Sequence, residues 1–350
     1  MTYYPAQLKM FDEILVNAAD NKINHAEQSK IDIRIDNGTI EVTNDGHGIF
    51  PAYIEEYGQY APELIFGESR TSSNFDSNEQ RIVGGKNGMG AKVVNIFSSR
   101  FEVETVCRGK LFKMAWEKGT PVDGSMTIKS TRRKDYTTVR FTPDVDKFGT
   151  ATKDIFDLYK KRAYDIAGTE SGLAIYFNGT RLPIEGFEQY CQLYAPDALY
   201  HKPTNVEARG RWEIAFTVSD EPSNVSFCNS VATIKGGKHV DVVADQVITH
   251  LLGVINSAKK GELVRPAQVR RFCTIFVNAK VDNPDYDDQK KECMTTVKSK
   301  HGSKPILSKK YLQEIEQTGI VDVVLKSLNQ RAKVTRLGIE PLCRNRETSF

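Results

Sequence analysis

Two short runs of alternating apolar residues flank an Asn-Gly dipeptide near the start of the chain, and they constrain the fold more than any other local pattern. The segment 30–42 reads KIDIRIDNGTIEV, with an apolar side chain at every second position on each side of Asn37-Gly38. A period of two predicts strands with one buried face, and Asn-Gly is a preferred centre of a two-residue hairpin turn. The two strands must therefore pair antiparallel.

Helices and further strands surround this hairpin in the sequence. The apolar positions between Pro5 and Asn21 recur with the spacing of an amphipathic helix, and Pro5 suits a first helical turn. Similar patterns predict strands over 101–106, 111–117, 126–130 and 137–141, a helix near 154–167 and a hairpin over 173–183. We therefore expect an α+β fold whose first part is an α/β sandwich, an antiparallel-rich sheet layered with helices.

The pattern restarts after residue 195, and a chain of 350 residues favours two domains over one. We place the domains at 1–195 and 196–335, with a tail at 336–350. In the second domain we predict strands over 212–218, 225–233 and 272–281, a helix over 239–255 and a last helix around 312–328.

Bulk composition excludes several classes of protein. No apolar run approaches the length of a membrane span, and the first residues lack the basic and apolar regions of a signal peptide, so we expect an intracellular, non-secreted protein without a membrane partner. The six cysteines are scattered without C-x-x-C pairs, which argues against zinc sites and disulfides and favours reduced, packed thiols. A net charge of +3 demands no nucleic acid by itself.

A glycine-rich stretch, RIVGGKNGMGAKVVNIF over 81–97, runs directly into a helical pattern. Because glycine has no side chain, a ligand can approach the backbone closely. A helix that begins near Gly90 would also point unpaired N–H groups at an anion. The spacing matches neither the P-loop nor the dinucleotide fingerprint. A flexible surface turn is therefore the alternative interpretation.

Polar residues on the first helix form a second candidate site. Glu13, Asn17 and Asn21 lie in one line at i, i+4 and i+8. A carboxylate can act as a general base, and an amide oxygen is a neutral ligand suited to phosphate-bound Mg²⁺. Asn44, in the NDGHG turn, could offer a base edge both a donor and an acceptor. An exposed polar stripe and an ordinary β-turn are the alternatives.

The order of these features along the chain resembles that of the GHKL ATP-binding family. Several longer sequence strings resemble one branch of this family, the ATPase and transducer region of eukaryotic-type type IIA DNA topoisomerases (topoisomerase II). The resemblance spans about residues 3–333. It rests on five strings: FDEILVNAADN (11–21), TSSNFD (71–76), GGKNGMGAKVVNIFS (84–98), NSVATIKGGKHVDVVADQV (229–247) and FVNAKVDNPDYDDQKKE (276–292).

This resemblance implies roles for individual residues in binding ATP and Mg²⁺. Glu13 would be the general base and Asn17 the Mg²⁺ ligand, and Lys291 would reach the γ-phosphate. The remaining ATP-binding residues implied are Asn21, Asn44, Ser72, Ser73, Asn74, Gly85, Lys86, Asn87, Gly88, Met89, Gly90, Ala91, Lys92, Gln289 and Lys290. The family has a Gln-Thr-Lys loop that corresponds to Gln289, Lys290 and Lys291 of this sequence. Because Lys290 replaces the threonine, the detailed geometry of this loop is left open.

The resemblance also implies a GHKL (Bergerat) fold followed by a βαβ-containing transducer domain, nuclear residence, and a homodimer whose ATPase gate closes on ATP binding. Duplex DNA would be a partner, with Lys259 and Lys260 in a lysine-rich loop that faces it. Arg265, Arg270 and Arg271 follow this loop in the sequence. Solvated surface charge is the alternative for these residues.

In the family, an N-terminal arm precedes the position that corresponds to the start of this sequence, and the DNA-cleaving domain follows the position that corresponds to its end. We therefore expect the ATPase portion only, either a truncated gene product or a natural short paralogue, with a weakened dimer and with the cleavage domain as a missing partner. A non-catalytic fragment that binds nucleotide weakly or pairs with a full-length subunit is the alternative function. Among other GHKL members, a histidine kinase would need a phospho-accepting helix before the first motif, and chaperones and repair ATPases lack the TSSN and DDQKKE pairing.

Overall fold

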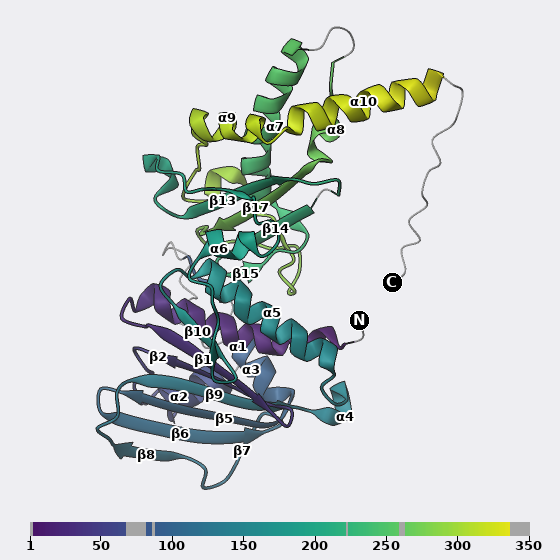
Figure 1. Cartoon of the computed structure of the whole chain (residues 1–350). Coiled ribbons are helices and arrows are strands. Elements are labelled where there is room, and N and C mark those ends of the chain that lie inside the picture. Colours follow the sequence, from purple (N-terminus) through teal and green to yellow (C-terminus); the bar gives the residue numbers. More distant parts are fainter. Residues whose placement is uncertain (1–2, 68–81, 86–87, 222, 259–262, 337–350) are drawn as a thin grey trace.

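The chain folds around two large β-sheets, each with its own layer of helices, and the described residues also form two small sheets of two strands each (Figure 1). The structure, a computed structural model, describes residues 3–67, 82–85, 88–221, 223–258 and 263–336. We use "N-terminal half" for the elements up to α6 (Phe187–Gln192) and "C-terminal half" for those from β12 (Leu199–His201) onward. The predicted boundary after residue 195 falls between these two elements and remains a prediction.

The first sheet is mixed and mostly antiparallel, as predicted. Within the described residues its strands run in the order β11-β10-β1-β2-β9-β5-β6-β7, and β8 also pairs with β6. The expected hairpin is confirmed, because Ile35 lies opposite Ile40 across Asn37-Gly38, whose φ angles are +47° and +78°. The strands are β1 (Lys30–Asp36), β2 (Thr39–Asp45), β5 (Ser98–Cys107), β6 (Lys110–Glu117), β7 (Thr120–Pro121), β8 (Thr127–Ser130), β9 (Tyr136–Pro143), β10 (Ala174–Phe177) and β11 (Thr180–Arg181).

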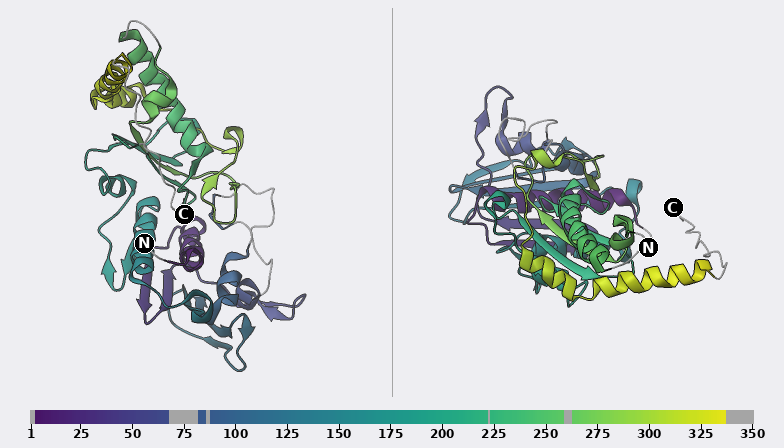
Figure 2. Two further views of the ribbon diagram at one scale, coloured as in Figure 1. Left: turned by 90° about the vertical axis from the view of Figure 1, so that its right-hand side faces the viewer. Right: turned by 90° about the horizontal axis from the view of Figure 1, so that it is seen from above.

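Three helices cover the face of this sheet that is turned toward the C-terminal half. They are α1 (Pro5–Asn24), α3 (Gly90–Ile96) and α5 (Lys153–Thr169). The apolar stripe predicted for α1 is buried, with Phe11 and Leu15 fully inaccessible in the core between helices and sheet. Figure 2 (left) shows α1 and α5 end-on, side by side between the two sheets. The polar line of α1 is thereby held at the junction of the two halves.

The second sheet has the order β12-β13-β17-β14-β15 in the described part of the chain, with β13 (Trp212–Val218), β14 (Ser223–Cys228), β15 (Val231–Ala232) and β17 (Cys273–Ala279). Strand β14, helix α7 (Lys238–Ala258) and strand β17 form a βαβ unit, because β14 and β17 pair in parallel. This confirms the predicted βαβ element. Helix α7 packs on one face of the sheet, with α9 (Lys309–Gln317) and α10 (Ile320–Arg336) beyond it (Figure 1).

Two predictions about individual elements were wrong. The strand predicted over 225–233 is two strands, β14 and β15, because Asn229 and Ser230 form a turn with φ of +49° and +62°. The helix predicted over 312–328 is two helices, because Gly319, with φ of +81°, breaks the backbone between α9 and α10. Between the NDGHG turn and the glycine-rich stretch, where the sequence analysis predicts no element, the described residues contain β3 (Tyr53–Ile54), β4 (Gln59–Tyr60) and α2 (Ala61–Gly67).

Apolar packing continues from one half into the other. Phe227 and Phe276 of the second sheet belong to the same buried cluster as the first-sheet core. The ring of Tyr190 in α6 lies 5.6 Å from that of Phe227, and the ring of Tyr194 lies 5.8 Å from that of Phe276. The two halves therefore share a buried apolar contact next to the polar site described below.

The structure also describes the state of most cysteines and the character of the helices. The five described cysteines are free thiols, and all but Cys293 are buried. None of the described helices combines the length and the apolar character that crossing a membrane requires.

Candidate functional site

A cavity of 280 Å³ opens where α1, the first sheet, the glycine-rich segment and a loop of the C-terminal half meet. Its walls bring together residues that are far apart in the sequence. The predicted site residues that line it are Glu13, Asn17, Asn21, Asn44, Gly85, Gly88, Met89, Gly90, Ala91, Lys92, Gln289 and Lys291. The helix expected to start near Gly90 is confirmed as α3, which begins at that residue.

Some predicted site residues are not placed at this cavity. Ser72, Ser73, Asn74, Lys86 and Asn87 lie outside the described residues, as do Lys259 and Lys260 of the proposed DNA-facing loop. Lys290 is described, but its side chain is exposed and does not line the cavity.

Glu13 lies at the charged end of the cavity, between two lysines. Its Oε1 is 2.9 Å from Lys9 Nζ, one helical turn earlier, and 3.5 Å from Lys291 Nζ, which comes from the other half of the molecule. Gly90 makes room for the carboxylate, since a Cβ there would lie 2.1 Å from Glu13 Oε2. Any larger residue at position 90 would therefore force the Glu13 carboxylate to move.

Lys291 is held in place by its own backbone as well as by Glu13. Its φ is +62°, and its N–H donates to the carbonyl of Asp288 at 3.2 Å. Its ammonium also donates to the carbonyl of Gly84 at 3.2 Å, and the side chain is largely buried. One cation of the C-terminal half thus contacts both α1 and the glycine-rich segment of the N-terminal half.

Asp20, a residue that the sequence analysis missed, anchors the glycine-rich segment to α1. Its two carboxylate oxygens accept hydrogen bonds from the backbone N–H groups of Gly84 and Gly85, at 2.9 and 2.8 Å. Burial raises the pKa of Asp20 to about 6, although the two amide donors oppose the shift. Asp20 follows Glu13 by seven residues, so helical periodicity was the available signal.

The opposite end of the cavity is neutral. The buried Asn44 and Asn21 both donate from Nδ2 to Gln28 Oε1, at 3.3 and 2.7 Å, and Gln28 Nε2 donates to the carbonyl of Ala18 at 2.9 Å. Gln28 is also a residue that sequence reasoning missed, because nothing in its neighbourhood marks a site. Apolar walls complete this end: Ala18, Val42, Ile49, Ile65, Phe66 and Val139.

The neighbouring Asp45 does not share this role. Its side chain accepts the backbone N–H groups of Ser29 and Lys30, both at 2.8 Å. The Asn-Asp pair is therefore divided, with Asn44 at the cavity and Asp45 closing the turn that leads into β1.

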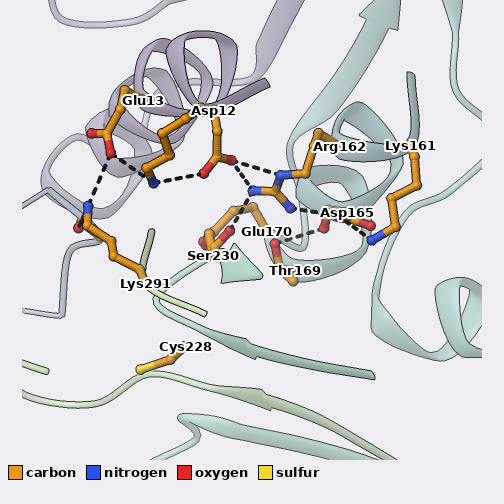
Figure 3. A network of polar contacts seen from close by, with 12 residues as sticks. Asp12, Glu13, Lys161, Arg162, Asp165, Thr169, Glu170, Cys228, Ser230 and Lys291 are labelled. Carbon is orange, nitrogen blue, oxygen red and sulfur yellow. Dashed lines mark hydrogen bonds and ion pairs between the residues drawn. The ribbon is translucent and has the colours of Figure 1, made fainter. Parts of the chain in front are cut away.

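A buried ion-pair network runs from Glu13 to the C-terminal half (Figure 3). Lys9 Nζ bridges Glu13 and Asp12, and Arg162 of α5 binds Asp12 Oδ1 through Nε at 2.8 Å. Arg162 also donates to Asp165 Oδ2 at 2.6 Å and to the carbonyl of Ser230 at 3.2 Å. Ser230 lies in the unpredicted turn between β14 and β15.

The charges of this network compensate for burial. Burial alone would raise the pKa of Asp12, but the charges of Arg162 and Lys9 lower it to about 2. Burial likewise opposes the charge of Arg162, whose pKa Asp12 and Asp165 nevertheless hold above its ordinary value. Both ends of the pair therefore remain ionised at neutral pH.

The oxygen atoms near Asn17 are suitable ligands for a hard cation that is bound to phosphates. Asn17 is exposed at the cavity wall, and Gly85 lies so close that a Cβ there would be 3.2 Å from Asn17 Oδ1. A neutral amide oxygen beside a carboxylate matches the oxygen preference of Mg²⁺, which commonly takes few protein ligands when it is bound to phosphates.

Comparison with known protein families divides the chain into two matched segments. Residues 7–147 match the family of histidine kinase-, DNA gyrase B- and HSP90-like ATPases, and residues 186–337 match the DNA gyrase B family. DNA topoisomerase 2-alpha of Gallus gallus is 44% identical over 346 residues, and that of Homo sapiens is 41% identical over 347 residues. Each alignment covers 95% of this chain, which spans only 22% and 23% of the two relatives.

Solved structures show the same similarity in three dimensions. The ATPase and transducer domains of DNA topoisomerase II from Balamuthia mandrillaris superpose with a TM-score of 0.89 at 37% identity, covering 95% of this chain and 87% of that one. The ATPase region of Saccharomyces cerevisiae topoisomerase II gives a TM-score of 0.86 at 36% identity, with 93% and 87% covered.

Proposed function

Because this chain belongs to the topoisomerase II family and corresponds to the ATPase and transducer region of its members, we propose that it binds and hydrolyses ATP in the cavity between its two halves. One observation carries this proposal: Glu13 and Lys291 come from different halves and meet 3.5 Å apart at the cavity wall.

The two ends of the cavity suit the two ends of a nucleotide. The neutral end offers the Asn44 amide and apolar walls to an adenine ring, with Asn21 beside it. The charged end offers Lys291 and the start of α3 to the phosphates. We assign Gln289, Gly88 and Lys92 to the phosphate side, because they line the cavity and belong either to the glycine-rich segment or to the loop that carries Lys291.

Glu13 is the proposed general base that orients and deprotonates the attacking water. Such a base contributes about 10²–10⁴-fold to a rate. Lys291 places positive charge where the γ-phosphate would stand, and the ion pair with Lys9 holds the Glu13 carboxylate in place at the cavity wall. Asn17 would hold Mg²⁺, which when bound neutralises phosphate charge.

The contact made by Lys291 also suggests how nucleotide state reaches the C-terminal half. A γ-phosphate would compete with Glu13 and the Gly84 carbonyl for the Lys291 ammonium. A ligand that contacts both halves favours one angle between them over others. We propose that this change drives closure of a dimer gate in the whole protein, which would move one DNA duplex through another in the nucleus.

Further parts of the proposal concern regions that the cavity does not include. We propose a nucleotide-binding domain over 1–195, a transducer domain over 196–335 and a tail over 336–350. We propose duplex DNA as a partner of Lys259 and Lys260 and the DNA-cleaving region of the family as the partner in the catalytic cycle. Such phosphate contacts would weaken as salt rises.

A turnover and assembly experiment tests the proposal. ATPase rate is measured with Mg²⁺ against protein concentration, and sedimentation is compared with and without a non-hydrolysable ATP analogue. We expect Mg²⁺-dependent turnover and analogue-induced dimers. Analogue binding without turnover would support the non-catalytic alternative, and failure to bind any adenine nucleotide would overturn the proposal.

A further inference from the structure

Ligand-type side chains from three separate segments meet beside the neutral end of the cavity. His47 follows β2, Cys107 ends β5, and Asp135 precedes β9. One ligand atom from each residue lies within 4.8 Å of those of the other two. We infer that His47, Cys107 and Asp135 form a binding site for Zn²⁺ or a similar divalent transition ion, separate from the proposed Mg²⁺ position at Asn17.

The donor set and its spacing fit such an ion. Imidazole, thiolate and carboxylate are the three zinc ligands of proteins, whereas Mg²⁺ disfavours nitrogen and sulfur. With Zn–N of about 2.0–2.1 Å and Zn–S of about 2.3 Å, tetrahedral geometry requires an N···S distance of about 3.5 Å. His47 Nε2 and Cys107 Sγ are 3.6 Å apart. The two atoms can therefore ligate one ion with almost no movement, and water would complete the tetrahedron.

The three segments are fastened together before any ion arrives. Ile49 N–H donates to Thr105 Oγ1 at 2.9 Å, and this hydroxyl donates to the carbonyl of Tyr136 at 3.0 Å. Gly48 presses against β5, since a Cβ there would lie 2.0 Å from the carbonyl oxygen of Val106. These contacts hold the residues next to each ligand in the sequence, so binding would need little ordering of the chain.

The Asp135 carboxylate is also oriented by a backbone hydrogen-bond donor. The backbone N–H of Arg108 donates to both oxygens of Asp135, at 3.1 and 3.2 Å. Hydrogen bonds of this kind fix ligating carboxylates in metal sites. Zinc binds cysteine as the thiolate, so ion binding would release the Cys107 thiol proton to solvent as the metal–sulfur bond forms.

A second group of possible ligands, His25, Glu27 and His47, shares His47 with the first. The rings of His25 and His47 are stacked, with centroids 4.4 Å apart and planes 24° from parallel. An ion lies in the plane of the imidazole that binds it, so two stacked rings cannot both point at one ion in this arrangement. We therefore assign the site to the side of Cys107 and Asp135, with His25 covering His47.

Titration of the metal-free chain with Co²⁺ tests the assignment directly. We expect one equivalent to produce a tetrahedral cobalt spectrum with a sulfur-to-cobalt charge-transfer band, which Zn²⁺ abolishes and excess Mg²⁺ does not. Cys107→Ser should lose the band, whereas the matched control Cys293→Ser, at a partly exposed thiol, should keep it. Absence of the band in the unaltered chain, or its persistence in Cys107→Ser, would overturn the assignment.

Because Cys107 is fully buried, a second pair of variants guards against misfolding. His47→Gln and Asp135→Asn change partly exposed side chains. Melting temperatures without metal should stay close to that of the unaltered chain. Zn²⁺ should raise the melting temperature of the unaltered chain, and the affinity for Zn²⁺ should fall about tenfold or more in each variant. Equal Zn²⁺ affinity in all three proteins would show that the ion binds elsewhere.

Discussion

The two ends of the cavity are built in different ways. Its neutral end consists of amides and apolar side chains that all come from the N-terminal half, and its principal contacts join Asn21, Gln28 and Asn44. At the charged end, Glu13 meets Lys291, which arrives from the C-terminal half. Base binding should therefore survive a change in the angle between the halves, whereas phosphate chemistry should not.

Electrostatics sharpens the same contrast. At the neutral end of the cavity, each hydrogen bond between uncharged groups contributes little net free energy to stability and depends weakly on its surroundings. Buried charges at the other end must be compensated, and the chain from Lys9 through Asp12 to Arg162 supplies that compensation. Substitutions at the two ends should consequently fail in distinguishable ways, which the following predictions use.

The largest effect is expected for Glu13→Gln, which keeps the shape of the side chain and removes the base. ATP turnover should fall by about 10²–10⁴-fold, because the attacking water is no longer deprotonated. Affinity for a non-hydrolysable analogue should change little. Steady-state ATPase assays check this, with the exposed Glu55→Gln as control. A rate within a few-fold of the unaltered chain would remove Glu13 from the mechanism.

Arg162→Met should be the most destabilising change. It leaves Asp12 and Asp165 buried without their shared partner, and removing one member of a buried ion pair costs about 3–5 kcal/mol. Chemical denaturation measures the free energy of unfolding. Arg181→Met, which breaks an exposed pair with Glu185, should cost about 0.2–1 kcal/mol or less. Equal losses in the two variants would mean that the buried network adds no stability.

Lys291→Ala should separate chemistry from binding. We expect turnover to fall by about 10²-fold or more, as for loss of one preorganised charge stabiliser, while nucleotide affinity is largely kept. Lys310→Ala, at an exposed lysine of α9, is the matched control. An unchanged ATPase rate in Lys291→Ala would contradict the cross-domain contact on which the comparison depends.

Asn44→Ala should show the opposite pattern at the base end. Loss of a buried hydrogen-bonding group costs about 1–3 kcal/mol, so nucleotide affinity should fall by about 5- to 150-fold with little change in kcat. Thr43→Ala, which alters the opposite face of the same strand, serves as control in calorimetric binding. A fall in kcat as large as the fall in affinity would show that the two ends are not independent.

The last expected effect is a pH dependence of stability that arises from Asp20. Its pKa rises from 3.8 in the unfolded chain to about 6 in the folded one, so the folded state binds more protons between these values. The stabilisation is complete below pH 3.8 and is lost as pH rises through about 6, with a slope of at most about 1.4 kcal/mol per pH unit. Denaturation curves of Asp20→Asn should lack this slope, and superimposable profiles of the two proteins would contradict it.

Local sequence patterns determined much of the fold. The hairpin around Asn37-Gly38, the buried stripe of α1 and the start of α3 at Gly90 all follow from interactions over a few residues, which is why their periodicity and turn chemistry predict them. The same patterns failed at Asn229-Ser230. There the Asn229 side chain donates to the carbonyls of Val83 and Val281, and such distant partners leave no local signal.

Candidate site residues divide along the same line. Glu13, Asn17 and Asn21 could be identified from helical spacing and Asn44 from the composition of its turn, and the resemblance to a known family added Lys291. Only the tertiary structure showed that Asp20 binds the glycine-rich segment, that Gln28 joins the two asparagines, and that His47 meets Cys107. Spacing along the chain measures neighbours within one element, whereas these contacts depend on where separate elements are brought together by burial of their apolar faces.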